Sequence, residues 1–223
     1  MAKYTVDSSL PYHMLLASLI PVVILVVSIQ LKNEYYFNLG LLYSTLSLIS
    51  LASIILLLIR AYRRRDIYEV RTVSPFELVY SYMVCFIALS VGAIVGSIIA
   101  MLACNISLLS ALPITVGSGT KKFLKALVHI SVGYSESGLI HISLPAFFAE
   151  NPRYAIVVAV FANILFAILH LYVYPVKYAV ISALLAGISV TLTNLYLAYN
   201  GVPSQQGVLL AHASWNIILT LLG

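Results

Sequence analysis

The stretch NLGLLYSTLSLISLASIILLLIR, residues 38–60, decides the fold class, because it contains no charged residue before Arg60. A helix needs roughly 20 predominantly apolar residues to cross the hydrocarbon core of a bilayer, and this stretch is long enough. The sequence therefore predicts an all-α protein, a polytopic transmembrane helical bundle of about seven spans, with six to eight as the range. The other apolar stretches are residues 12–31, 76–104, 123–149, 154–174, 176–198 and 206–222.

The composition predicts a single membrane domain over residues 1–223. Hydrophobic residues make up 62% of the chain and charged residues 9%, and the connections between the apolar stretches are short. Lipid requires backbone polar groups to be satisfied within the protein, which favours helices throughout. Residues 1–104 are expected to form N-terminal scaffold spans. The first span has no small-residue cleavage pattern after it, so we expect it to remain uncleaved.

Arginines crowd the connection between the second and third apolar stretches. The positive-inside rule places this connection in the cytoplasm, and the flanking spans explain the basic residues without nucleic acid. We expect a multi-pass protein of the cell membrane whose partners include membrane lipids and exclude nucleic acid. The arginines are Arg60, Arg63, Arg64, Arg65 and Arg71.

The lysines that open the fourth apolar stretch conflict with a count of seven spans. With seven spans and a cytoplasmic amino terminus, Lys121, Lys122 and Lys125 lie outside the cell, which the positive-inside rule disfavours. Either residues 105–120 partly re-enter the membrane, or the true number of spans differs by one.

The two cysteines are expected to be ordinary buried apolar residues. Cys85 and Cys104 lie on the same apolar stretch, and one unbroken helix separates them by about 28 Å, too far for a disulfide.

Four polar residues lie inside apolar stretches of the second half: Glu136, His170, His212 and Asn216. An ionisable side chain at bilayer depth costs about 2.5–3.5 kcal/mol on insertion scales, so each marks a candidate functional site. His212 and Asn216 are four residues apart and therefore share a helix face. If the three stretches adjoin, these groups converge on one polar cavity, whereas His129 and His141 taken singly are expected to be structural.

Two chemistries fit a carboxylate and two imidazoles. Glu136, His170 and His212 are a feasible zinc set, although the i, i+4 pair of helix-borne ligands typical of such sites is missing. In the metal-free alternative, Glu136 is a general base on water, His170 assists it, and His212 with Asn216 stabilises an oxyanion.

The spacing of these residues resembles a known family. Phe166 and His170 read FxxxH, and LLAHASWN, residues 209–216, contains HxxxN at His212 and Asn216. With Glu136 before them, they resemble the CAAX-protease and bacteriocin-processing family, also called the Abi family, which includes the Ras-converting CAAX endoprotease. Its pattern is EExxxR, FxxxH and HxxxN or HxxxD, and the resemblance covers about residues 123–223.

The first motif departs from the family pattern. Aligning its leading Glu with Glu136 puts Ser137 at the second Glu and His141 at the Arg. The resemblance implies that Glu136 activates water, while Ser137 and His141 take positions that support the site, with Phe166 packing the cavity wall.

The resemblance implies an intramembrane endopeptidase that uses no metal or other cofactor and cleaves a peptide or membrane-protein substrate. Residues 121–223 would then be the CAAX-protease-like core. The altered first motif favours a second hypothesis, a non-catalytic scaffold or subunit of a membrane-protein complex. A transporter is a third, although we find no paired half-repeats. On straight helices His170 and His212 differ in depth, which a bent span or a re-entrant stretch near residues 200–206 would reconcile.

Overall fold

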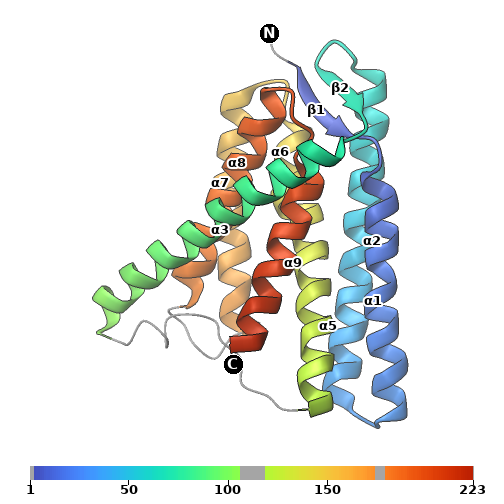
Figure 1. The fold of residues 1–223 in the computed structure, drawn as a ribbon, viewed down its shortest axis with the longest axis vertical. Coiled ribbons are helices and arrows are strands. Elements are labelled where there is room, and N and C mark those ends of the chain that lie inside the picture. Colours follow the sequence, from blue (N-terminus) through green and yellow to red (C-terminus); the bar gives the residue numbers. More distant parts are fainter. Residues whose placement is uncertain (1–2, 106–118, 174–178, 223) are drawn as a thin grey trace.

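The computed structural model describes residues 3–105, 119–173 and 179–222, with backbone only for residues 119–122, 169–173, 179 and 222. Helices dominate the described chain (Figure 1), and one of them is continued by a π-helical segment. The helices are α1 (Leu10–Gln30), α2 (Glu34–Arg63), α3 (Pro75–Cys104), α5 (Gly119–Glu136), the π-helix η1 (Ser137–Ser143), α6 (Leu144–Phe147), α7 (Pro152–Val173), α8 (Ala179–Tyr199) and α9 (Gln205–Leu222).

Four helices in the described part of the chain are long and apolar enough to cross a membrane. They are α1, α2, α3 and the Val180–Tyr199 part of α8, while α7 contributes a shorter apolar helix, Pro152–Ile168. All seven apolar stretches of the sequence form helices close to the expected boundaries. The structure thus supports a helical membrane protein, but it does not confirm the count of seven spans.

Local sequence fixes the start of each of the two longest helices. The side chain of Asn33 accepts a hydrogen bond from Tyr36 N and so caps α2. Ser74 and Glu77 form a reciprocal capping box at the start of α3, where Pro75 occupies the first turn and has no amide proton to satisfy.

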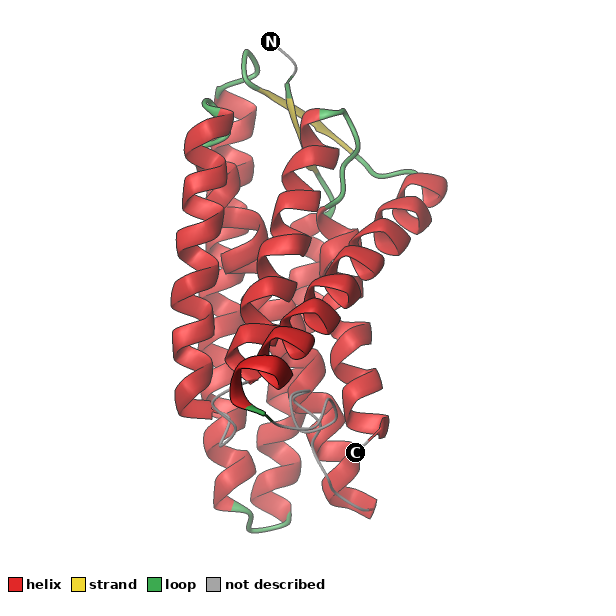
Figure 2. Cartoon of the chain, turned by 90° about the vertical axis from the view of Figure 1, so that its left-hand side faces the viewer, coloured by secondary structure: helices red, strands yellow, loops and turns green. Residues whose placement is uncertain are grey.

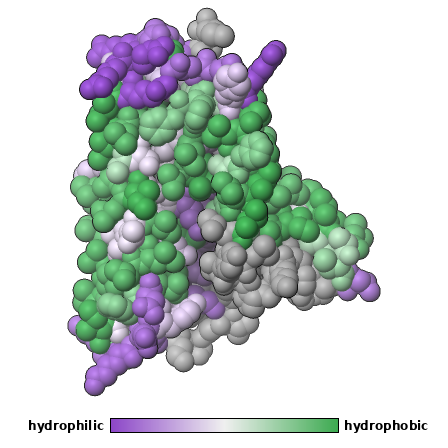
Figure 3. Space-filling model, turned by 180° about the vertical axis from the view of Figure 1, so that it is seen from behind, coloured by the Kyte–Doolittle hydropathy of each residue, from purple (hydrophilic) through white to green (hydrophobic). Residues whose placement is uncertain are grey.

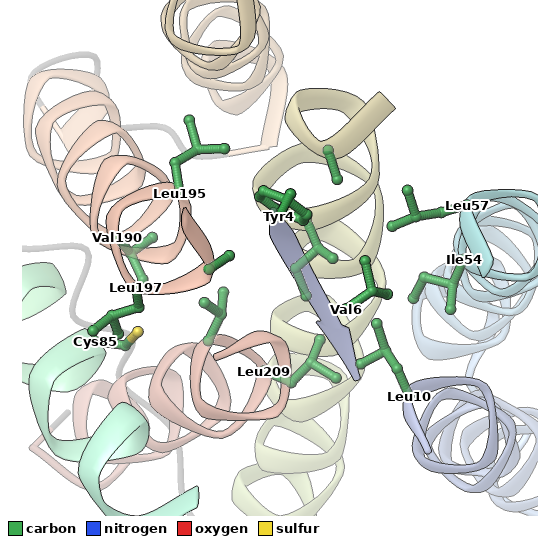
Figure 4. Packing of buried hydrophobic residues seen from close by; sticks show 14 of the residues in the cluster. Tyr4, Val6, Leu10, Ile54, Leu57, Cys85, Val190, Leu195, Leu197 and Leu209 are labelled. Carbon is green, nitrogen blue, oxygen red and sulfur yellow. The ribbon is translucent and has the colours of Figure 1, made fainter. Parts of the chain in front are cut away.

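A short parallel pair of strands, absent from the predicted all-α fold, closes one end of the bundle. β1 (Tyr4–Asp7) pairs with β2 (Tyr68–Arg71) in the register Tyr4 with Tyr68. Gln205 at the start of α9 accepts a hydrogen bond from Asp7 N and donates one to Thr5 O, so β1 also holds α9. Figure 4 shows Tyr4 and Val6 among apolar side chains from α2, α8 and α9.

Helix α3 crosses the bundle obliquely and packs on α8 and α9 (Figures 1 and 2). Glycines permit the closest approach, because a Cβ at Gly92 would lie 2.5 Å from Leu185 O and one at Gly96 2.6 Å from Ser182 Cα. Small residues at such crossings are typical of helix packing in membranes.

The surface is apolar along the helices and hydrophilic at their ends, as Figure 3 shows for one face. Cys85 is buried, as expected, but Cys104 is exposed, so the expectation that both cysteines are buried is wrong for Cys104. Cys104 is the last residue of α3, and this end of the helix lies apart from the other helices (Figure 1).

Candidate functional site

The segment that carries the first motif is a transition between two kinds of helix. Glu136 is the last residue of α5, and η1 begins at Ser137 and includes His141. The hydroxyl of Ser143 donates to Gly138 O at 2.7 Å, across five residues, as the wider turn allows. π-Helical turns inside α-helices occur frequently at functional sites because they redirect side chains.

Ser137 of η1 bonds directly to His212 of α9. The distance from Ser137 Oγ to His212 Nδ1 is 2.8 Å, and both side chains are buried. Gly133 allows α5 and α9 to approach closely, because a Cβ there would lie 2.9 Å from Ala213 N. The residue at the second position of the first motif therefore contacts the His of the third.

The rings of His141, Phe166 and His212 form a triangle. The ring centroid of His141 is 5.5 Å from each of the other two rings, and the rings of Phe166 and His212 are 6.5 Å apart. One side chain from each of the three sequence motifs thus lies in this cluster of rings.

The hydrogen bonds of Thr191 in α8 fix the protonation of one nitrogen of His141. Thr191 Oγ1 lies 2.7 Å from Gly187 O, to which it donates its only proton. It lies 2.8 Å from His141 Nδ1, so that nitrogen must be the donor in this contact. In a neutral imidazole the proton is then on Nδ1, and Nε2 is an acceptor.

Two asparagines hold the same region. Asn163 Nδ2 of α7 donates to Thr191 Oγ1 at 3.0 Å, and Asn194 Nδ2 of α8 donates to His141 O at 3.0 Å. Ser204 donates in turn to Asn194 Oδ1 at 2.7 Å, which connects the loop before α9 to the π-helix. Sequence reasoning missed Thr191, Asn163 and Asn194, although the two asparagines carry the signal that singled out Asn216, an amide inside an apolar stretch.

Residues of the three motifs line a cavity of about 50 Å³. A water molecule needs roughly 10–15 Å³ of such volume and two to four polar partners, so the cavity has room for a few waters. His141, Phe166, His212 and Asn216 line it together with His129. The other lining residues are Leu89, Ala93, Ser182, Ala183, Ala186, Gly187, Trp215 and Leu219.

Asn216 lines the cavity but is partly engaged elsewhere. Its Nδ2 donates to His129 O at 3.0 Å, which leaves its second amide proton for another acceptor. His129 Nδ1 contacts Thr220 Oγ1 at 3.2 Å, the kind of neighbour bond expected of a structural histidine.

Glu136 has a buried carboxylate oxygen, Oε2, that finds no hydrogen-bond partner within the described part of the chain. Glu136 is not among the described residues that line the cavity. His129, seven residues earlier, does line it. Seven residues are about two helical turns, so both residues project from the same face of α5. A buried carboxylate oxygen without a partner is costly, and a water or a ligand would satisfy it.

The remaining predicted site residue is His170. Its backbone belongs to α7, but its side chain lies outside the described residues, so the structure does not test its pairing with Glu136. The described residues contain no group of three His, Cys, Asp or Glu side chains arranged to hold a metal ion, and the zinc set that includes His170 is likewise untested.

Comparisons with known proteins identify no relative: no family model, no curated protein and no solved structure matches the chain.

Proposed function

We propose that the protein crosses the cell membrane about seven times and is an intramembrane endopeptidase of the glutamate type, similar to the CAAX-protease and bacteriocin-processing family. The observation that carries this proposal is the convergence of His141, Phe166 and His212 on a cavity large enough for water. The buried Oε2 of Glu136 adds to it, because this oxygen has no hydrogen-bond partner among the described residues and Glu136 shares a face of α5 with His129, which lines the cavity.

In the proposed reaction, Glu136 removes a proton from a water molecule and the resulting hydroxide attacks the scissile carbonyl. His170 orients the carboxylate, while His212 and Asn216 donate hydrogen bonds to the oxyanion of the tetrahedral intermediate. Glu136 then returns its proton to the leaving amine as the carbon–nitrogen bond breaks. Proton acceptance and return by one carboxyl group balance the hydrolysis without a metal or other cofactor.

The altered first motif acquires a role in this scheme. If Ser137 donates to His212 Nδ1, the proton of the neutral His212 ring is on Nε2, which can then donate to the oxyanion. His141 takes the place of the family's Arg in the wall beside His212. A short polar side chain at each position thus replaces a longer charged one.

A scaffold or subunit of a membrane-protein complex is the second candidate. The polar side chains of the region satisfy one another to a large extent, through the pairs Ser137–His212 and His141–Thr191 and the donation from Asn216 to His129 O. A self-satisfied network is what a structural role requires.

The test compares cleaved membrane-protein termini in host cells that carry the wild type or Glu136→Gln. The variant keeps shape but cannot accept the proton, so we expect processing to fall at least the roughly 10²–10⁴-fold that general-base catalysis contributes. Glu69→Gln, at the exposed end of the bundle, is the matched control and should process normally. Identical termini in the wild type and Glu136→Gln would reject the peptidase, and co-purification of a membrane partner would then test the subunit.

A further inference from the structure

A second cavity, of about 590 Å³, lies at the arginine-rich end of the molecule. It shares no residue with the cavity of the candidate site among the described lining residues. Its volume is within the range of about 300–1,000 Å³ typical of small-molecule sites. The proposed peptidase reaction gives it no role.

The walls of this cavity are apolar and reach the surface of the bundle. Ile156 of α7 and Tyr196 of α8 line it and are 46% and 67% exposed. Leu192 and Leu195 of α8 and Ile67 line it further in. A groove between two apolar helices, open along its side, matches an acyl chain better than a polar metabolite.

The rim carries charges of both signs. Asp66, Glu150 and Asn200 line the cavity. Behind them, Arg64 bonds both oxygens of Asp66 at 3.1 Å and Glu150 Oε1 at 3.2 Å, and Arg60 also bonds Glu150 Oε1. Asp66 and Glu150 are thus among the described lining residues, whereas Arg60 and Arg64, which bond their carboxylates, are not.

These charges lie where lipid headgroups are expected. Helix α2 has 30 residues and is about 45 Å long, whereas a bilayer's hydrocarbon core is about 30 Å thick, so its end at Arg60 and Arg63 extends to headgroup level. Tyr196 and Tyr199 also line this cavity, and tyrosines are enriched at membrane interfaces.

We propose that this cavity binds a phospholipid whose headgroup carries a primary ammonium, such as phosphatidylethanolamine. One acyl chain lies along Ile156 and Leu192, the ammonium donates to the carboxylates of Glu150 and Asp66, and the phosphate lies beside Arg60 and Arg64. An anionic lipid fits less well, because acidic residues and no arginine are among the described residues that line the cavity. The proposal rests on the membrane placement of the chain and not on peptidase activity.

The experiment is native mass spectrometry of detergent-purified protein supplied with equal amounts of phosphatidylethanolamine, phosphatidylcholine and phosphatidylglycerol. We expect one bound phosphatidylethanolamine, preferred about tenfold or more, because a trimethylated ammonium cannot donate the charge-assisted hydrogen bonds. Glu150→Gln should remove most of this preference. Glu69→Gln, which makes the same charge change at the same end outside this cavity, should keep it.

A second pair of variants separates the apolar groove from the charged rim. Ile156→Trp fills the groove and should lower the retention of all three lipids, whereas Ile49→Trp, at a site 45% exposed on α2, should not. Equal retention of the three lipids, or a preference for phosphatidylglycerol, would reject the ammonium site. Unchanged retention in folded Glu150→Gln and Ile156→Trp would reject this cavity. The experiment contains no peptide substrate and measures only lipid retention. Its outcome therefore does not depend on whether the protein is a peptidase.

Discussion

Polar side chains bond differently in the two halves of the molecule. Along α1 and α2, hydroxyl groups donate mainly within their own helix, as Ser28 does to Ile24 O at 2.5 Å and Ser44 to Gly40 O at 2.7 Å. In η1, α8 and α9, hydroxyl groups such as that of Thr191 also donate within their own helix, but polar side chains there additionally bond from one helix to another, as in the pairs Ser137–His212 and His141–Thr191. Ser50 of α2 is an exception, since it donates to Ser135 O in α5 and ties the scaffold to the helix that ends at Glu136.

A hydrogen bond within one helix satisfies a polar group, whereas a hydrogen bond between two helices also fixes where that group lies. A hydroxyl that donates to the carbonyl one turn back is satisfied wherever its helix lies. Such a bond therefore does not constrain the positions of neighbouring helices. A bond between helices forms only at one relative position of the two, and a connected network of such bonds specifies a unique arrangement. The second half therefore has the more strictly defined geometry, and substitutions there should have the larger effects.

The largest expected effect tests whether the cross-helix network serves chemistry. His212→Ala removes a proposed oxyanion donor, and loss of one such donor costs about 10²–10³ in rate. Ser44→Ala removes a hydroxyl bonded within its own helix and should leave the rate unchanged. The measurement is the processing rate of a substrate identified by the comparison of Glu136→Gln with the wild type. Equal rates for both variants would show that the two halves do not differ in function.

A smaller effect tests packing at two glycines. A Cβ at Gly187 would lie 2.1 Å from Asn163 Oδ1, so Gly187→Ala must displace a side chain that bonds Thr191. We expect the free energy of unfolding to fall by about 1–3 kcal/mol, as for other overpacked sites.

The control for this packing test is Gly40→Ala. Its Cβ would lie 3.0 Å from Leu25 Cγ and 3.2 Å from Leu25 N, so the neighbouring helix needs to shift by only a few tenths of an ångström. Alanine also favours the helix by up to about 1 kcal/mol, so the net loss of stability should be smaller than for Gly187→Ala. Denaturant titrations of both variants in the same detergent decide the matter. Equal losses of stability would mean that the second half is not the more strictly packed.

The carbonyl of His141 offers a third comparison. Asn194→Ala leaves His141 O without the amide that donates to it at 3.0 Å, and a buried group left unsatisfied costs about 1–3 kcal/mol. Ser53→Ala removes a bond to Ile49 O on the more exposed side of α2 and should change stability by less than about 0.5 kcal/mol.

Combining Asn194→Ala with Ser204→Ala should cost less than the sum of the two single changes, because the residues share a bond. Strict additivity would show that they do not act together.

The helices could be predicted because apolar length alone determines them. The stretch expected at residues 76–104 forms Pro75–Cys104, with a capping box at its start. The strands could not, because β1 and β2 have four residues each and form through a pairing of distant segments. The π-helix likewise has no local sequence signal that we recognised.

The candidate site was predicted in part. Motif spacing singled out Phe166 and His212, and the family resemblance added His141. The structure brings these three rings together, whereas the predicted pairing of Glu136 with His170 lies outside what it tests. Thr191 and Asn194 were missed because they belong to no motif, and the hydrogen bonds that give them a role depend on how α8 meets η1.

The smallest expected effect concerns the charged end, where polar bonds face solvent. Arg64, hydrogen-bonded to Asp66, lowers the pKa of this carboxyl group below its ordinary value. A carboxyl whose pKa is lower in the folded state stabilises the fold above its unfolded pKa, about 3.9, and loses this contribution as pH falls through the folded pKa. The melting temperatures of the wild type and Asp66→Asn should therefore differ slightly between pH 8 and 5 and converge below about pH 4. Added salt should also shrink the difference, because exposed ion pairs are screened. A difference that grows on acidification would mean that Asp66 acts through something other than its charge.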